Sequence, residues 1–158
     1  MSPPPTILCI DDNVLLLALR KALLESSDFK VFTAENGTAG LEIANREQID
    51  VAILDYNLPG MDGGRVAQEL RRSCPRLAIL LSSGMQEIPE SVLALMDGVV
   101  PKGASSVVMI QTINRVIRAK SAPAVQLPEI ARTEQVEHSR GFVRPKQIRG
   151  RLRGKRTR

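Results

Sequence analysis

The sequence predicts an α/β protein in which helices cover both faces of an open parallel sheet. Short apolar runs alternate with amphipathic stretches of helical period as far as residue 120. Two of these runs, residues 52–54 and 77–81, are apolar throughout, which is typical of strands buried on both faces. With 158 residues the chain is long enough for one domain with its own core and too short for two ordinary ones.

Each predicted element of the first half rests on a short-range signal. Strands are predicted where branched and aromatic residues run together, and helices where apolar residues recur every three or four positions. In chain order these signals predict a strand at residues 6–10, a helix at 13–26 capped by Asp12 or Asn13, a strand at 29–34, a turn at 35–37, a helix at 38–46 and a strand at 50–54.

The second half continues the alternation. It is predicted to contain a helix at 62–72, a strand at 77–81, a short helix at 89–96 with Pro89 in its first turn, and a brief strand at 99–100. Ser105 or Ser106 is predicted to cap a last helix, whose apolar positions recur at helical spacing: Met109, Ile110, Ile113, Val116 and Ile117. Five strands thus alternate with five helices, and in such sheets the functional site lies at the carboxyl ends of the strands.

Charge and composition divide the chain at residue 120. Residues 121–158 hold 10 Lys and Arg against 3 Asp and Glu, so the high isoelectric point belongs to this segment. We expect an N-terminal extension at 1–5, a domain at 6–120 and a basic, disordered tail at 121–158. The sequence shows no secretory signal, no stretch long enough to span a membrane and two cysteines, so we expect a cytoplasmic protein without disulfides.

Chemically active side chains stand at the ends of four predicted strands. Asp11 and Asp12 follow the first strand, Asp55 the third, Ser82 the fourth and Lys102 the fifth. Each has an ordinary explanation by itself, as a helix cap, a turn residue or a surface charge. Together they are harder to explain, because three carboxylates at one sheet edge repel each other unless something offsets their charge. A divalent cation with oxygen ligands, such as Mg²⁺, would do so.

These residues, with the loop DYNLPGMDG at 55–63, resemble the receiver domain of two-component response regulators over residues 6–120. The resemblance implies a flavodoxin-like (CheY-like) sheet with strand order 2-1-3-4-5. It also implies that Asp55 accepts a phosphoryl group from a sensor histidine kinase or phosphotransfer protein, with slow self-catalysed transfer and dephosphorylation. We expect the loop to leave Asp55 exposed at the strand end.

The resemblance implies roles for the other residues of the set. Asp12 would bind Mg²⁺ directly (Mn²⁺ is a possible substitute), Asp11 mostly through water, and Asp55 and the backbone carbonyl of Asn57 would complete the protein ligands. Lys102 would pair with the phosphoryl oxygens, and the Ser82 hydroxyl would donate to one of them. Positioning and charge neutralisation are what phosphoryl transfer needs most.

The sequence departs from the family near the fifth strand. Val99 stands where the family usually has an aromatic residue, and Gly103 follows the lysine where a cis proline is usual, so no cis peptide is expected there. Residues 84–98 are also short for a fourth helix and its flanks. These departures lie on the face whose conformation commonly changes when the family is phosphorylated. They therefore bear on that conformational change more than on the phosphorylation itself.

Three functions are compatible with the sequence. The favoured one is a single-domain phosphoacceptor that signals to an unknown downstream protein by contact. A nucleic-acid-associated regulator could use the basic tail, although we favour a solvated tail without specific function. A receiver-like module that is never phosphorylated is opposed by the complete set of acidic, hydroxyl and lysine residues. His138, the one histidine, lies in the tail and is expected to have no specific role there, in preference to being a phosphorelay site.

Overall fold

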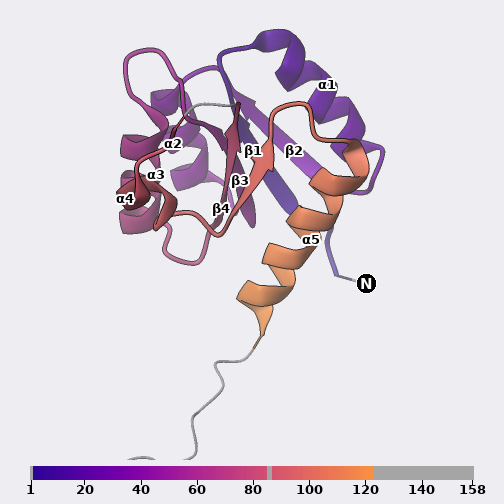
Figure 1. Ribbon diagram of the computed structural model, residues 1–158. Helices are drawn as coiled ribbons and strands as arrows, with labels where there is room; N and C mark the ends of the chain where they lie inside the picture. The colour runs from indigo at the N-terminus through magenta and orange to yellow at the C-terminus, as the bar shows by residue number, and fades with distance from the viewer. Residues whose placement is uncertain (1, 85–86, 123–158) are drawn as a thin grey trace, which may run out of the picture. The chain divides into compact units, whose positions relative to one another are not determined.

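The computed structural model describes residues 2–84 and 87–122 (Figure 1). Five strands lie in one parallel sheet of order β2-β1-β3-β4-β5, as predicted. The strands are β1 (Thr6–Ile10), β2 (Lys30–Ala34), β3 (Val51–Asp55), β4 (Ala78–Ser83) and β5 (Gly98–Pro101), and the helices are α1 (Val14–Glu25), α2 (Gly37–Arg46), α3 (Gly63–Ser73), α4 (Glu90–Leu93) and α5 (Ser106–Ser121).

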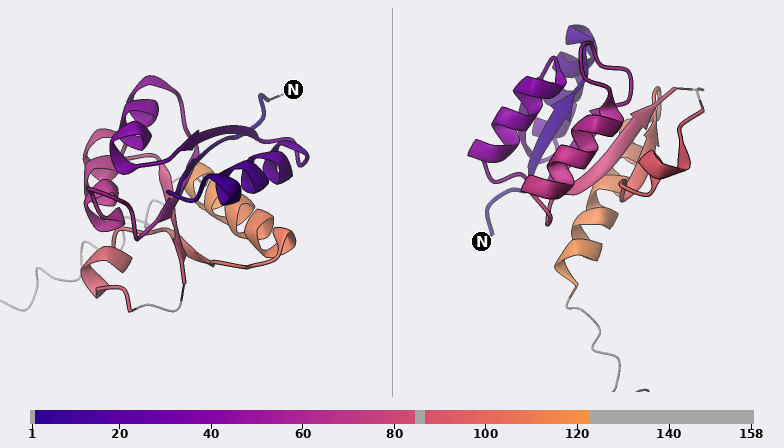
Figure 2. Two further views of the ribbon diagram at one scale, coloured as in Figure 1. Left: turned by 90° about the horizontal axis from the view of Figure 1, so that it is seen from above. Right: turned by 90° about the vertical axis from the view of Figure 1, so that its left-hand side faces the viewer.

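Two apolar clusters fill the space on the two faces of the sheet. Successive residues of a strand point to opposite faces, so Ile7 and Cys9 pack with the inward sides of α1 and α5, while Leu8 and Ile10 pack with those of α2 and α3. The views in Figures 1 and 2 show this division, with α1 and α5 on one side of the sheet and α2 and α3 on the other. All four residues are fully buried, so β1 runs through the centre of the core.

The predicted elements all form, and most bounds agree within one or two residues. The largest differences concern the fourth strand and the fourth helix. β4 continues to Ser83, so Ser82 pairs with β5 instead of following the strand. α4 has 4 residues instead of the predicted eight, and Pro89 is its cap instead of lying within its first turn.

The shortness of α4 has physical causes on both sides of the helix. Pro89 provides no side-chain cap, which leaves the first N–H groups of the helix without that support. Shortly afterwards the Asp97 N–H donates to the Ile79 carbonyl oxygen at 2.8 Å, and the Asp97 carboxylate accepts from the Ile79 N–H at 2.8 Å. The chain therefore has to return to the sheet after little more than one helical turn.

The predicted tail cannot be compared with this fold, because residues 123–158 lie outside the described ranges. α5 runs to Ser121, where its last turn carries Arg118 and Lys120. Among residues 2–84 and 87–122, no helix is long and apolar enough to cross a membrane.

Candidate phosphorylation site

The end of β1 provides two carboxylates in different environments. Asp11 is fully buried, and its Oδ1 accepts from the Asn13 N–H at 3.0 Å. Asp12 is exposed. Of the two candidate caps for α1, Asn13 takes the role, because its side chain accepts from the Leu16 N–H at 3.1 Å. The Asp12 carboxylate is thus not required to cap the helix.

Asp55 ends β3 beside this pair. Its Oδ2 accepts from Lys102 Nζ at 2.8 Å, and its Oδ1 accepts from the Asn57 N–H at 3.3 Å. The expectation that Asp55 is exposed is wrong, since the residue is 1 % exposed. The loop does place it at the sheet edge, but the Lys102 side chain, itself 35 % exposed, lies against the carboxylate.

The loop after Asp55 turns tightly into α3. Gly60 has a φ of 79°, the left-handed conformation that glycine adopts without strain. The Gly63 N–H then donates to the Tyr56 carbonyl at 2.8 Å, and the Asp62 side chain caps α3 by accepting from the Arg65 N–H at 2.9 Å. A Cβ on Gly63 would lie 2.7 Å from the Tyr56 Cα, so this position tolerates no side chain without a backbone shift. The two turn residues thus allow the loop to fold back beside its own strand.

Lys102 reaches the site from the end of β5. Its backbone N–H donates to the Ser83 carbonyl at 2.8 Å, which continues the strand pairing, and its Nζ lies 3.8 Å from Asp11 Oδ2 as well as beside Asp55. Gly103 follows with a φ of 88°, so glycine suits the turn that leaves β5. The peptide bond between Lys102 and Gly103 is trans.

Ser82 has a partner that the sequence analysis missed. The hydroxyl is fully buried, and its Oγ accepts from Arg20 Nη2 at 2.6 Å. Arg20 Nη1 lies 3.4 Å from Asp11 Oδ2, so the guanidinium bridges the ends of β1 and β4. A signal was present in the sequence: Arg20 occupies the same helical stripe as Leu17 and Leu24, where an apolar residue would be expected.

The three carboxylates are close enough to share a metal ion. One carboxylate oxygen from each of Asp11, Asp12 and Asp55 lies within 4.8 Å of the other two. Hard oxygen ligands with an exposed member suit Mg²⁺, which keeps several waters and is usually bound through one or two carboxylates. The donor set therefore fits the ion that the sequence predicts. The role of the Asn57 backbone carbonyl as a further ligand stays a prediction.

Val99 lies near the site but outside it. Its side chain is 45 % exposed and lines a shallow cavity of about 280 Å³ with residues of β4, α4 and β5. Leu93, 40 % exposed, borders the same cavity. A small apolar hollow thus lies beside Val99, the sequence position at which the family that the chain resembles usually has an aromatic residue. His138 lies outside the described residues.

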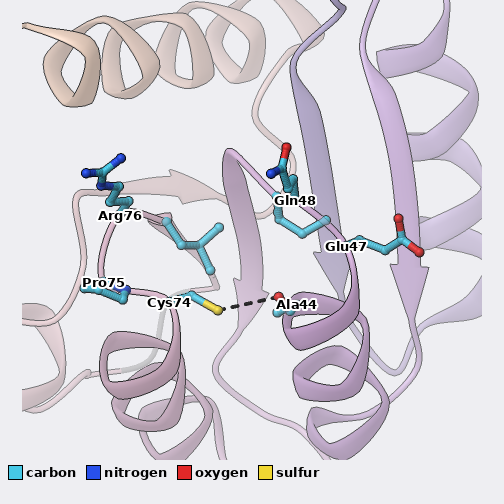
Figure 3. A pocket seen from close by; sticks show the side chains of 8 residues that line it. Ala44, Glu47, Gln48, Cys74, Pro75 and Arg76 are labelled. Carbon is cyan, nitrogen blue, oxygen red and sulfur yellow. Dashed lines mark hydrogen bonds between the residues drawn. The ribbon is translucent and has the colours of Figure 1, made fainter.

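A second cavity, of about 320 Å³, lies at the amino ends of the strands, away from the carboxylates (Figure 3). It is formed where α2 leads to β3 and α3 leads to β4, and its lining is largely apolar. Cys74 lies in it with its thiol donating to the Ala44 carbonyl at 3.5 Å. Because the carboxylates, Ser82 and Lys102 all stand at the other edge of the sheet, this cavity takes no part in their chemistry.

The comparisons with known proteins agree with this geometry. Residues 7–114 match the family described as the response regulator receiver domain. The chain is 34 % identical over 96 residues to the transcriptional regulatory protein GlrR of Escherichia coli, a match that covers 61 % of this chain and 22 % of that protein. It is 38 % identical over 71 residues to the sensor histidine kinase GacS of Pseudomonas protegens, covering 45 % of this chain and 8 % of that one. The chain thus spans less than a quarter of either relative.

Solved structures show the same fold. A response regulator receiver domain protein from Clostridium thermocellum is 30 % identical with a TM-score of 0.68, and the match covers 74 % of this chain and 97 % of that one. A CheY-like receiver domain protein from Methanospirillum hungatei, at 22 % identity and a TM-score of 0.71 over 75 % of this chain and 97 % of that one, supports the fold alone. With the family match over residues 7–114 and this strand order, the chain belongs to the response regulator receiver domain family.

Proposed function

We propose that this chain is a Mg²⁺-dependent phosphoacceptor that carries a signal from a sensor histidine kinase or phosphotransfer protein to another protein. The observation that supports this most is the position of the Asp55 carboxylate, which lies within 4.8 Å of two further carboxylates and 2.8 Å from the Lys102 ammonium. Acidic groups that can share a metal, beside a cation at the end of a central strand, are what phosphoryl transfer to a carboxylate requires.

In the proposed reaction an Asp55 oxygen attacks the phosphorus of a phosphohistidine. The new O–P bond forms an acyl phosphate, the P–N bond breaks, and the imidazole leaves with its electron pair and takes up a proton. Lys102 leaves Asp55 Oδ2 and pairs with a phosphoryl oxygen, which keeps the ammonium next to negative charge throughout. Asp12, Asp55 and the Asn57 carbonyl would hold Mg²⁺ directly and Asp11 mostly through water, and the ion would supply charge neutralisation at the phosphoryl oxygens.

Ser82 has one proton to offer to the modified aspartate. Its Oγ already accepts from Arg20, and a hydroxyl can accept and donate at once, so its O–H can turn to a phosphoryl oxygen. β-strand pairing places Ser82 directly beside Asp55. Ser82 therefore already lies where its hydroxyl could donate to a phosphoryl oxygen on Asp55.

The test uses the full chain, Mg²⁺ and acetyl phosphate, followed by intact mass measurement. The wild-type protein should gain one phosphoryl group, which hydroxylamine should remove because acyl phosphates are cleaved by that nucleophile. Asp55→Asn should abolish the gain, since an amide cannot take the group. Asp62→Asn is the matched control, because Asp62 lies in the same loop but caps α3 through its side chain, and it should keep the labelling.

The rival functions predict other results. A receiver-like module that is never phosphorylated would gain no mass with either donor class, acetyl phosphate or a phosphorylated histidine kinase. Labelling that persists in Asp55→Asn would show that another residue is the acceptor. Either result would overturn the proposal.

A further inference from the structure

Arg20 is a buried charged residue on a helix face that is otherwise apolar. It is 5 % exposed and lies between Leu17 and Leu24, both buried, on the side of α1 that packs against the sheet. Burying a guanidinium is costly unless it is paired and hydrogen-bonded. Its contacts should therefore show what compensates this cost.

The two hydrogen-bond partners of the guanidinium, Ser82 and Asp11, belong to the proposed site. Nη2 donates to Ser82 Oγ at 2.6 Å, and Nη1 lies 3.4 Å from Asp11 Oδ2. Lys21, the next residue, points elsewhere and pairs with Glu25 at 2.8 Å and the Val31 carbonyl at 2.9 Å. Of these two adjacent cations, Arg20 alone is directed at the acidic edge.

With Arg20 included, the site has two cations for three carboxylates. Lys102 Nζ lies 2.8 Å from Asp55 Oδ2 and 3.8 Å from Asp11 Oδ2, and Arg20 Nη1 lies 3.4 Å from the same Asp11 oxygen. Asp11 is fully buried and so depends on these cations for much of its compensation. Lys102 can leave through the exposed side, whereas Arg20 is enclosed by the core.

We infer that Arg20 is a built-in countercation and positioning residue of the phosphorylation site. Its fixed positive charge offsets part of the acidic cluster and so lowers the affinity of the cluster for Mg²⁺. Its hydrogen bond uses an acceptor position of Ser82 Oγ and leaves the hydroxyl proton available for the phosphoryl group. This inference rests on the proposed function, because the metal and the phosphoryl group are part of it.

The effect on metal binding follows from Coulomb's law. A unit positive charge a few Å from a divalent cation reduces its affinity by about ten-fold even at the dielectric constant of water, and by more at a buried site. Removing the charge should therefore tighten Mg²⁺ binding by about ten-fold or more. A residue that merely fills space would have no such effect.

The experiment measures Mg²⁺ affinity of the full chain by the fluorescence of Tyr56. Tyr56 is the one tyrosine, the chain has no tryptophan, and the residue follows Asp55 directly. The variants are Arg20→Met, which removes charge and hydrogen bonds, and Arg20→Lys, which keeps the charge. Lys21→Met is the matched control, because it removes a neighbouring cation of the same helix that pairs outside the site.

We expect Arg20→Met to bind Mg²⁺ at least about ten-fold more tightly, and Arg20→Lys and Lys21→Met to stay within about three-fold of wild type. The melting temperature of Arg20→Met should fall without metal and recover with Mg²⁺ by more than wild type gains, since tighter binding stabilises the folded state more. Arg20→Gln, which keeps a donor for Ser82, should bind Mg²⁺ as tightly as Arg20→Met and replaces it if that variant does not fold.

Three results would count against the inference. Equal Mg²⁺ affinity of the wild type and the neutral variants would overturn it and leave the proposed function intact. A drop in melting temperature that is the same with and without Mg²⁺ would show a purely structural arginine. If no variant and no wild-type protein bound Mg²⁺, the metal site of the proposed function would fail together with the inference.

Discussion

Replacing Gly63 by alanine should disturb both the fold and the loop that follows the proposed phosphoacceptor Asp55. A Cβ at this position would lie 2.7 Å from the Tyr56 Cα and would collide with the carbonyl oxygen of Asp55. Both obstacles are backbone atoms, so neither can rotate out of the way. The Gly63 N–H bond to the Tyr56 carbonyl, at 2.8 Å, also fixes how closely α3 approaches β3. The substitution must therefore push the start of α3 away from the strand that carries Asp55.

The size of the effect can be worked from these contacts. Overpacking in a well-packed region costs about 1–3 kcal/mol. Alanine's better helix propensity returns about 1 kcal/mol or less at this position in the first turn. We expect Gly63→Ala to lose about 1–2 kcal/mol of unfolding free energy. A shift of about 1 Å in a reacting group can cost about a hundred-fold in rate, so phosphorylation of Asp55 should slow by about ten- to hundred-fold.

Gly64→Ala is the matched control. It lies in the same turn of α3, and its Cβ would meet side-chain atoms instead of backbone atoms, the nearest being Val92 Cγ2 at 2.9 Å and Asp62 Oδ1 at 3.1 Å. Urea unfolding followed by circular dichroism gives the stability, and intact mass after timed exposure to acetyl phosphate gives the rate. If Gly63→Ala were as stable and as quickly phosphorylated as Gly64→Ala, the close backbone approach would not set the geometry of the loop.

Four further predictions concern the metal, the readout, acid stability and the tail. Asp12→Ala should weaken Mg²⁺ binding far more than Asp62→Ala in a titration, and equal losses would contradict the metal site. On addition of a beryllofluoride mimic, amide shifts should centre on β4 and its following loop, with β5 quieter because Val99 has no ring to swing; the largest shifts at Val99 would refute this. Burial raises the pKa of Asp97, but hydrogen bonds from Arg71, the Ile79 N–H and Lys120 outweigh it and lower the pKa below its ordinary 3.8. The charged Asp97 therefore stabilises the fold above about pH 4, and this stabilisation is lost as the pH falls through the lowered pKa. Asp97→Asn should be less stable than wild type at neutral pH and should lose less stability on acidification. Urea midpoints at the two pH values would show both effects. Truncation after Lys120 should leave a folded domain that is still phosphorylated on Asp55, and an unfolded product by circular dichroism would place the boundary elsewhere.

The sequence predicted the fold well because its signals are local and agree with one another. Apolar runs such as Ile53 and Leu54 in β3 lie at 0 % exposure, and the predicted caps at Asn13 and Ser105 form as side-chain hydrogen bonds. Strand order came from the family resemblance instead, because alternation of strands and helices does not by itself specify which strand lies in the middle.

The candidate site was predicted in its residues and less well in its surroundings. Strand ends converge at one edge of a parallel sheet, so Asp11, Asp55 and Lys102 could be placed together from their positions in the sequence. The burial of Asp55 and the Arg20 contact to Ser82 depend on where long side chains fold, and no local spacing encodes that. Arg20 was overlooked because helical periodicity alone treats a charged residue in an apolar stripe as an interruption.

The two cysteines occupy environments that differ enough to give them separate chemical uses. Burial raises the pKa of the Cys9 thiol to about 12, so almost no reactive thiolate is present at neutral pH while β1 stays in the core. Cys74 is half-buried in the cavity at the far edge of the sheet. An alkylating reagent should modify Cys74 first, and Cys9 at a rate set by how often the central strand is exposed. The native thiols therefore allow the rate at which the core opens to be measured, and Cys74 provides a labelling position away from the proposed phosphorylation site, without any engineered substitution.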